Sequence, residues 1–352
     1  EAGYSSARAH QLATLATRKA KEYGVDADTL EGRWRAEAAA LGFGPEQLAT
    51  CFGAPAERAG VDVEQLFVDL AGPEGLTKQA STFARKDVVE ALCERLGSDA
   101  DAETIGRLTD EFIGSGHVAV LAPQSNNVEQ VHRRGGGRRR SHDLARYTTP
   151  ELLELERRLL HSADQGFGAN VPGANPDAVE RAVAAKTSLS EEQIAMIRAV
   201  CAPDAPAVQL VAGRPGSGKT YATAACVEAF VTTGAPVAGC ALSATAAAEL
   251  ESATNLQVLT GRPARTIARM VLDIRRHGLP QGIVLLVDEA SMVGTRDLAA
   301  LVEAVGAAGG AIKLIGDPDQ HGPVDAGGFF AALCREHETE VVGLFANNRQ
   351  LD

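Results

Sequence analysis

Aromatic side chains are scarce in this sequence of 352 residues, at 4%, while alanine is abundant, a composition that favours helices. No apolar run approaches the roughly 20 residues that a membrane-spanning helix needs, and no signal peptide opens the chain. We therefore expect a globular protein with no membrane segment. Because the first residue is Glu1 and the last residues do not resemble a natural end, we also expect a fragment of a longer protein.

Paired cysteines and excess positive charge are also lacking. The six cysteines form no Cys-x-x-Cys motif, which argues against a zinc site and for reduced thiols in the cytoplasm. The net charge of −12 excludes nucleic-acid binding through general surface charge, so any such contact must be a local groove. Residues 133–140 place five arginines around three glycines, and this basic loop either contacts a DNA backbone or is simply solvated.

The chain is organised around residues 213–220, which read GRPGSGKT. The apolar segment 207–211 precedes them and the helical stretch 221–232 follows, which is the context that a phosphate-binding P-loop requires. The glycines let backbone N–H groups turn onto phosphate oxygens, and the helix N-terminus adds positive charge there. Lys219 is expected to reach the β- and γ-phosphates of ATP, and the Thr220 hydroxyl to bind Mg²⁺.

Two carboxylates follow the apolar segment 283–287. We expect Asp288 to hold Mg²⁺ directly or through water, and Glu289 to orient and deprotonate an attacking water. A strand-terminal Asp-Glu pair also occurs as a helix cap. Its position downstream of a P-loop favours the nucleotide role.

Two glutamines are further candidates. Gln320 follows the apolar segment 311–315, where its amide would sense the γ-phosphate, although a Gly-Asp-Pro turn needs no other purpose. The Gln193 amide has the donor and the acceptor to read an adenine edge, while Ser190-x-x-Gln193 is also a capping box, and both roles can hold. The predicted ATP-binding residues are Gln193, Gly213, Pro215, Gly216, Ser217, Gly218, Lys219, Thr220 and Tyr221.

Three hydroxyl side chains open helical segments later in the chain. Ser243, Thr245 and Thr266 are candidates to hydrogen-bond phosphates of a bound strand, and each is equally an ordinary helix cap.

The pattern along the chain predicts an α/β protein with a mainly helical beginning. From residue 189 apolar strands alternate with helices, which indicates a parallel sheet flanked by helices with ligands at the carboxyl ends of the strands. The expected strands are 207–211, 237–241, 283–287, 311–315 and 341–344. Earlier, we expect a helix over 26–41, a strand over 117–121, a helix opening after Thr148 or Thr149, and a linker over 165–176.

Taken together, the motifs resemble those of superfamily 1 DNA helicases of the RecD/TraI kind, in the same order. Residues 347–350, Asn-Asn-Arg-Gln, look like the fourth motif of that family, whose arginine reaches the γ-phosphate. Residues 80–88, 146–151, 292–298 and 325–329 are similar to conjugative relaxases of the TrwC/TraI (MobF) type. The resemblance covers residues 76–352 well and the helical start more loosely.

The resemblance implies a first RecA-like motor domain at 187–352, a helicase accessory domain at 76–186 and a helical connector at 1–75. It implies ATP hydrolysis with Mg²⁺ for movement on single-stranded DNA, with catalytic roles for Lys219, Glu289, Gln320 and Arg349. The implied partners are single-stranded DNA, a missing second RecA-like domain and the conjugation machinery.

The sequence also departs from that family. His321-Gly322 follow Gln320 where the family has Leu, and Ala268 stands where it commonly has His. A relaxase also needs a nucleophilic Tyr and a cluster of three His, and the eight histidines here are dispersed, so we assign no DNA nicking to this chain. Two alternatives stay open: a RecD-like repair helicase without a relaxase, and a truncated module that binds ATP or DNA without turnover.

Overall fold

The computed structural model describes residues 26–47, 62–97, 100–122, 145–169, 171, 173–320, 322 and 325–345. Contacts divide the chain into two units, 1–61 and 62–352. In the first unit, helix α2 spans Ala27–Ala40, and Asp26 caps it by accepting a hydrogen bond of 2.8 Å from the Thr29 N–H. The helix expected over 26–41 is therefore confirmed. Trp34 on this helix is 65% exposed, so its ring does not form a core among the described residues.

The second unit begins with a small bundle, which we call the accessory bundle. It consists of the helices α4 (Val63–Ala71), α5 (Arg85–Leu96) and α6 (Ala102–Ile113) and the antiparallel strands β1 (Ala119–Ala122) and β2 (Arg146–Thr148). Its core contains Phe67, Phe83 and Phe112, and the Phe67 and Phe112 rings meet edge to face with centroids 5.2 Å apart. Strand β1 lies close to the expected 117–121. Strand β2 escaped prediction because three residues carry too little periodicity.

Six parallel strands form the sheet of the second unit, in the order β5-β4-β6-β7-β3-β8. Their bounds are β3 Val208–Gly213, β4 Val237–Ala241, β5 Arg265–Thr266, β6 Val284–Asp288, β7 Ala311–Gly316 and β8 Val341–Leu344. All five expected strands are confirmed to within two residues. The edge strand β5 was missed because it is only two residues long.

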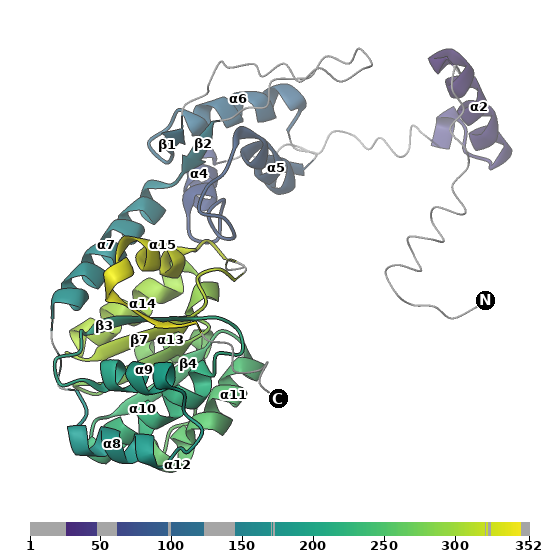
Figure 1. Ribbon diagram of the computed structural model, residues 1–352. Helices are drawn as coiled ribbons and strands as arrows, with labels where there is room; N and C mark the ends of the chain where they lie inside the picture. Colours follow the sequence, from purple (N-terminus) through teal and green to yellow (C-terminus); the bar gives the residue numbers. More distant parts are fainter. Residues whose placement is uncertain are drawn as a thin grey trace, which may run out of the picture. The chain divides into compact units, whose positions relative to one another are not determined.

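Helices cover both faces of this sheet (Figure 1). Alternate strand residues divide between the faces, as the period of two along a strand requires: Leu210, Leu285 and Leu314 face one core, and Val211, Leu286 and Ile315 face the other. The first core includes side chains of α7 (Pro150–Gly168), α13 (Ile267–His277), α14 (Thr295–Ala307) and α15 (Phe329–Glu336). The second includes α8 (Pro176–Ala184), α9 (Glu191–Cys201), α10 (Lys219–Thr233) and α12 (Leu256–Thr260).

The helix α7 runs further than the sequence indicated. Thr149 caps it and Pro150 occupies its first turn, as expected, but it continues to Gly168, so the linker expected from residue 165 was wrong for its first four residues. The reason is tertiary packing: a Cβ on Gly166 would lie 2.3 Å from Cγ2 of Val208, so this glycine lets the helix approach strand β3. The boundary at 186/187 stays a prediction, and we note that Leu159 and Ala163 of α7 share a core with the sheet.

A lysine lies inside the second core. Lys313 of β7 is 1% exposed, and its ammonium donates hydrogen bonds of 3.0 Å to the Pro206 carbonyl and to Oε1 of Gln209. Gln209 in turn donates to the Ala199 carbonyl of α9 at 3.1 Å. This buried polar chain ties the P-loop strand, its neighbour and α9 together. Burial lowers the pKa of Lys313 to about 8.

We expect Lys313→Met to flatten the pH dependence of stability above pH 8. In the wild type the unfolded chain keeps this proton up to a pKa of 10.5, while the folded chain releases it near pH 8. Folding stability should therefore rise with pH across that window, and the variant should lose that contribution. Urea unfolding at pH 7, 8, 9 and 10 measures the difference. Parallel curves for the two proteins would contradict the prediction.

None of the described helices is long and apolar enough to cross a membrane.

Candidate functional site

The functional motifs converge on one edge of the sheet. Because the strands are parallel, their carboxyl ends lie along the same edge. Loop 214–218 follows β3, Ser243 follows β4, Asp288 ends β6 and Glu289 follows it, and Asp317 follows β7.

The P-loop has the backbone expected of a phosphate cradle. Gly216 and Gly218 both adopt left-handed conformations, with φ of 81° and 78°. Gly218 then caps α10, whose N-terminal residue is Lys219. Gly213 lies close to the loop as well, since a Cβ there would lie 3.0 Å from Oγ of Ser217. The glycines that shape this turn are therefore required by its conformation and not only by the motif.

Gln193 lies directly beneath the loop and is 3% exposed. Its Nε2 donates to the Ser217 carbonyl at 2.9 Å, and its Oε1 accepts from the Ser190 N–H at 2.9 Å. The capping box of α9 is thus confirmed. A Cβ on Gly218 would lie 2.2 Å from Nε2 of Gln193, so the two residues fit only because residue 218 is glycine. Adenine recognition by Gln193 stays a prediction, and it would use the second N–H of the amide and the remaining lone pair on Oε1.

The Lys219 ammonium lies inside the loop, half-buried. It donates to the carbonyls of Gly213 at 2.6 Å and Arg214 at 3.1 Å. An ammonium has three donors, so one is left for a phosphate oxygen. Burial lowers the pKa of Lys219, while the negative charges of Asp317, Asp288 and Glu289 raise it. The carboxylates at the ends of β6 and β7 are therefore close enough to the P-loop lysine to act on its charge.

Asp288 and Glu289 are both half-buried and differ in backbone conformation. Burial raises the pKa of Asp288, although the hydrogen bond of 3.0 Å from the Glu289 N–H lowers it. The pKa of Glu289 is raised by burial and then by the charges of Asp288 and Glu249. Glu289 also adopts a left-handed backbone with φ of 56°, which is strained for a residue with a Cβ and occurs disproportionately at functional sites. A raised pKa makes this carboxylate a stronger base, which suits a group that takes a proton from water.

The turn after β7 contributes a residue that the sequence did not single out. Asp317 is 6% exposed, and its Oδ1 accepts from the Asp319 N–H at 3.0 Å. Its charge is the largest favourable one acting on Lys219. The Gly-Asp-Pro sequence carried this signal, but we interpreted it as a turn. Gln320 lies exposed just beyond, with its backbone N–H bonded to the Asp317 carbonyl. A γ-phosphate contact by Gln320 stays a prediction.

The remaining predicted residues are placed as follows. Pro215 is exposed in the loop, and Thr220 is half-buried in the first turn of α10. Tyr221 is 38% exposed, its hydroxyl is 3.0 Å from Oγ of Ser188, and Lys186 lies over its ring at 5.3 Å. Arg349 and the basic loop 133–140 lie outside the described residues.

The hydroxyl side chains after β4 and β5 act as helix caps. Ser243 accepts from the Ala246 N–H at 3.0 Å, and Thr266 accepts from the Arg269 N–H at 3.3 Å. Thr245 is exposed in the first turn of α11 (Ala244–Thr254). The capping role is confirmed for Ser243 and Thr266, and contact with DNA phosphates stays a prediction for all three.

The donor set fits Mg²⁺ held together with a nucleotide. Within the described part of the chain, no group of three or more His, Cys, Asp and Glu could hold a metal by itself. Mg²⁺ keeps several waters and is commonly bound by one or two protein oxygens plus phosphates. The half-buried Asp288 carboxylate, whose pKa burial raises, is the kind of group that a cation would stabilise in its charged form.

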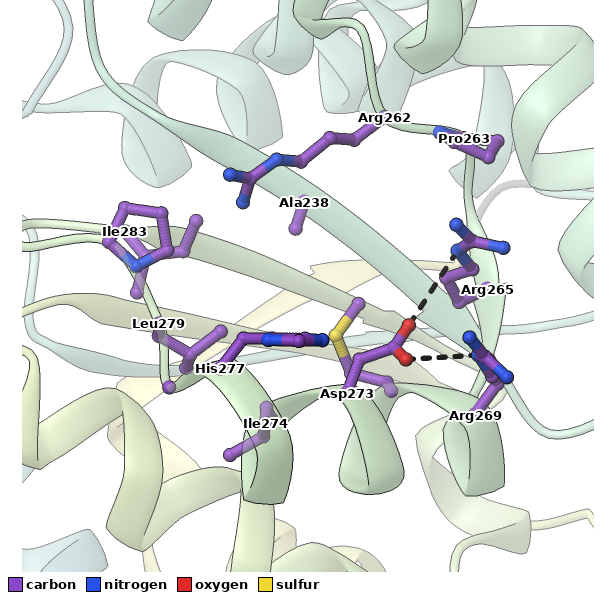
Figure 2. A pocket seen from close by; sticks show the side chains of 13 residues that line it. Ala238, Arg262, Pro263, Arg265, Arg269, Asp273, Ile274, His277, Leu279 and Ile283 are labelled. Atoms are coloured by element: carbon purple, nitrogen blue, oxygen red, sulfur yellow. Dashed lines mark ion pairs between the residues drawn. The ribbon is translucent and has the colours of Figure 1, made fainter.

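A pocket of about 590 Å³ lies elsewhere, between α13 and the segment that leads into β5 (Figure 2). Asp273 pairs there with Arg265 at 4.0 Å and Arg269 at 3.0 Å, and Arg262 and His277 complete a basic lining. None of the residues lining this pocket belongs to the predicted nucleotide site.

Comparison with known proteins supports the nucleotide interpretation. A family model described as an AAA domain matches residues 188–352. The expected fold class, a RecA-like parallel sheet flanked by helices and preceded by a mainly helical region, is thereby confirmed.

Two kinds of curated relatives are similar over 54% of this chain. The conjugal transfer protein TraA of Rhizobium radiobacter is 34% identical over 192 residues, which are 17% of its length. The ATP-dependent RecD2 DNA helicase of Deinococcus radiodurans is 32% identical over 203 residues, which are 26% of its length. The chain thus spans about a sixth to a quarter of these relatives. The similarity agrees with the RecD/TraI resemblance and with a helicase-type function, and it does not reach the finer TrwC (MobF) assignment.

Proposed function

We propose that this chain carries the first motor domain of an ATP-dependent helicase that moves on single-stranded DNA, within a cytoplasmic conjugative relaxase of the TrwC/TraI type. The observation that carries the proposal is the convergence of the Lys219 ammonium with the carboxylates of Asp288, Glu289 and Asp317 beside a left-handed glycine loop. A structural turn has no need of a half-buried lysine among three carboxylates, whereas ATP hydrolysis uses the lysine for the phosphates, one carboxylate for Mg²⁺ and one as the base.

In this proposal the N–H groups of the loop and of the α10 N-terminus bind the phosphates. The third donor of Lys219 is directed to the β- and γ-phosphates. Thr220 and Asp288 would hold Mg²⁺, which neutralises phosphate charge when bound. Glu289 accepts the proton of the attacking water, Gln320 senses the γ-phosphate, and Arg349 stabilises charge in the transition state. Ser243, Thr245 and Thr266 lie along the same edge of the sheet for contact with DNA.

A RecD-like repair helicase is the second candidate, because the similarity to the RecD2 helicase covers the same share of this chain as the similarity to TraA. Both candidates use the same ATP site. The sequence upstream of Glu1 separates them, since a relaxase requires a nucleophilic Tyr and a His cluster there.

ATP binding and ATP hydrolysis by this chain, with and without single-stranded DNA, test the proposal. We expect wild-type protein to bind ATP and Lys219→Ala to bind it at least about tenfold more weakly, because the loop loses its phosphate-directed charge. Turnover stimulated by DNA would support a working site in this chain. ATP binding without turnover would indicate a half-site that the second motor domain completes. Failure of the wild type to bind ATP would overturn the proposal.

A further inference from the structure

One arginine joins the accessory bundle to the segment that follows the Asp-Glu pair. Residues 76–78 lie in the loop between α4 and α5 of the bundle, and the chain passes from the bundle to the sheet domain at residues 149–151, where α7 begins. Arg296, in the first turn of α14, contacts both places. Its Nη1 donates to the Thr77 carbonyl at 2.8 Å, and its Nη2 donates to Oγ1 of Thr77 at 3.0 Å and to Oε2 of Glu151 at 2.7 Å.

The contacts around Arg296 combine a buried threonine with side chains of opposite charge. Thr77 is fully buried, and its hydroxyl lies 3.5 Å from that of Thr149, which caps α7. The Arg296 side chain is 25% exposed and also faces Glu156. Burial raises the pKa of Glu156 and the charge of Arg296 opposes this. Because the planar fork of an arginine matches a carboxylate and several acceptors at once, a lysine cannot reproduce these contacts.

A short segment connects Arg296 with the end of β6, and it packs against the end of β7. A short 3₁₀ turn, η2 (Ala290–Met292), separates Glu289 from the start of α14. Gly316 at the end of β7 packs against this turn, since a Cβ there would lie 3.0 Å from the Ser291 nitrogen. The short segment between Glu289 and Arg296 therefore packs against the end of β7.

The segment after β7 links the start of α14 to the loop between α4 and α5. The Thr295 N–H donates to the Ala326 carbonyl at 2.7 Å, and the Ala326 N–H donates to the Lys78 carbonyl at 3.0 Å. Gly294 and Gly327 also pair as an isolated antiparallel β-bridge. Segments 294–296 and 325–327, which the sequence only associated with a family, thus hold residues 77 and 78 of the loop between α4 and α5.

We propose that Arg296 is a positioning residue that couples the nucleotide state of the Asp288-Glu289 site to the docking of the accessory bundle, through its contacts with Thr77 and Glu151. This inference rests on the proposed function. In this proposal, nucleotide bound at the P-loop shifts the end of β6 and η2, and Arg296 passes that shift to the loop between α4 and α5 and to the start of α7. Removal of the side chain separates the two events without touching the P-loop.

Hydrogen exchange with and without Mg²⁺ and the analogue AMP-PNP tests the coupling, with AMP-PNP affinity measured separately. In the wild type we expect the analogue to change exchange in residues 76–84 and at the amides of Thr295 and Ala326. In Arg296→Ala the affinity should stay within about threefold, because the P-loop is intact, while exchange at Ala326 without nucleotide rises about tenfold. The nucleotide-dependent change in residues 76–84 should disappear, and Arg296→Lys should restore only part of it.

Arg158→Ala is the matched control. Arg158 of α7 pairs with Glu303 of α14 at 3.8 Å, so it also links α7 with α14, but at another place along the two helices. This variant should respond to AMP-PNP as the wild type does. A wild-type response in Arg296→Ala would overturn the coupling, and so would binding of AMP-PNP to the wild type without any change in residues 76–84. Failure of the wild type to bind AMP-PNP would instead overturn the proposed function itself.

Discussion

Glu289→Gln is expected to lower the rate of ATP hydrolysis at least about a hundredfold while ATP affinity stays within about threefold of the wild type. The carboxylate is the base in the proposed reaction, and an amide of the same shape cannot take up the proton. Burial and the charges of Asp288 and Glu249 raise the pKa of Glu289, which makes its carboxylate a stronger base. Single-turnover hydrolysis and equilibrium binding of ATP separate the two effects.

Glu249→Gln provides the matched control for this experiment. Glu249 is exposed on α11 and acts on Glu289 only through its charge. Removing that negative charge favours the ionised form of Glu289 and lowers its pKa. The loss of activity on acidification should therefore occur at lower pH in Glu249→Gln, with the rate at pH 8 unchanged. If Glu289→Gln kept the wild-type rate, Glu289 would not be the base.

Gly218→Ala is expected to weaken ATP binding at least about tenfold, because it disturbs both the loop and its support. An alanine at φ 78° costs about 1 kcal/mol or more. Its Cβ would also lie 2.2 Å from Nε2 of Gln193, which holds the Ser217 carbonyl. Because Gln193 is buried and hydrogen-bonded at both ends of its amide, it cannot move aside without breaking the contact with the loop.

A substitution at the glycine that caps the other end of α10 separates the backbone strain of an alanine from its steric clash with Gln193. Gly234 caps the C-terminus of α10 at φ 88°, and a Cβ there meets no atom within 4 Å. Gly234→Ala should therefore lower the free energy of unfolding by about as much as the backbone strain in Gly218→Ala does, and keep its ATP affinity. The double variant Gly218→Ala, Gln193→Ala removes the collision together with the contacts of Gln193, so its ATP affinity should stay below that of the wild type. Isothermal titration with ATP and thermal unfolding of the four proteins give the comparison, and equal ATP affinities for the two glycine variants would refute the role assigned to Gln193.

The fold was predictable to the extent that its signals are local. Buried parallel strands are short apolar runs, so the five longer strands of the sheet could be located from the sequence. Strands of two and three residues, β5 and β2, could not be located because pairing with a neighbour defines them. The helix α7 is longer than predicted for a related reason. Gly166 suggests a linker in the sequence, but in the structure it permits close packing on Val208.

The sequence by itself determined the P-loop, the Asp288-Glu289 pair and the alternation of strands and helices, because each depends on residues close together in the chain. Only the tertiary structure decided the strand order, the position of Gln193 under Ser217, the charge of Asp317 beside Lys219, and the contact between Thr77 and Arg296. Those two residues lie 219 positions apart. A contact over such a separation depends on how both cores pack, and no periodicity or motif in the sequence encodes it.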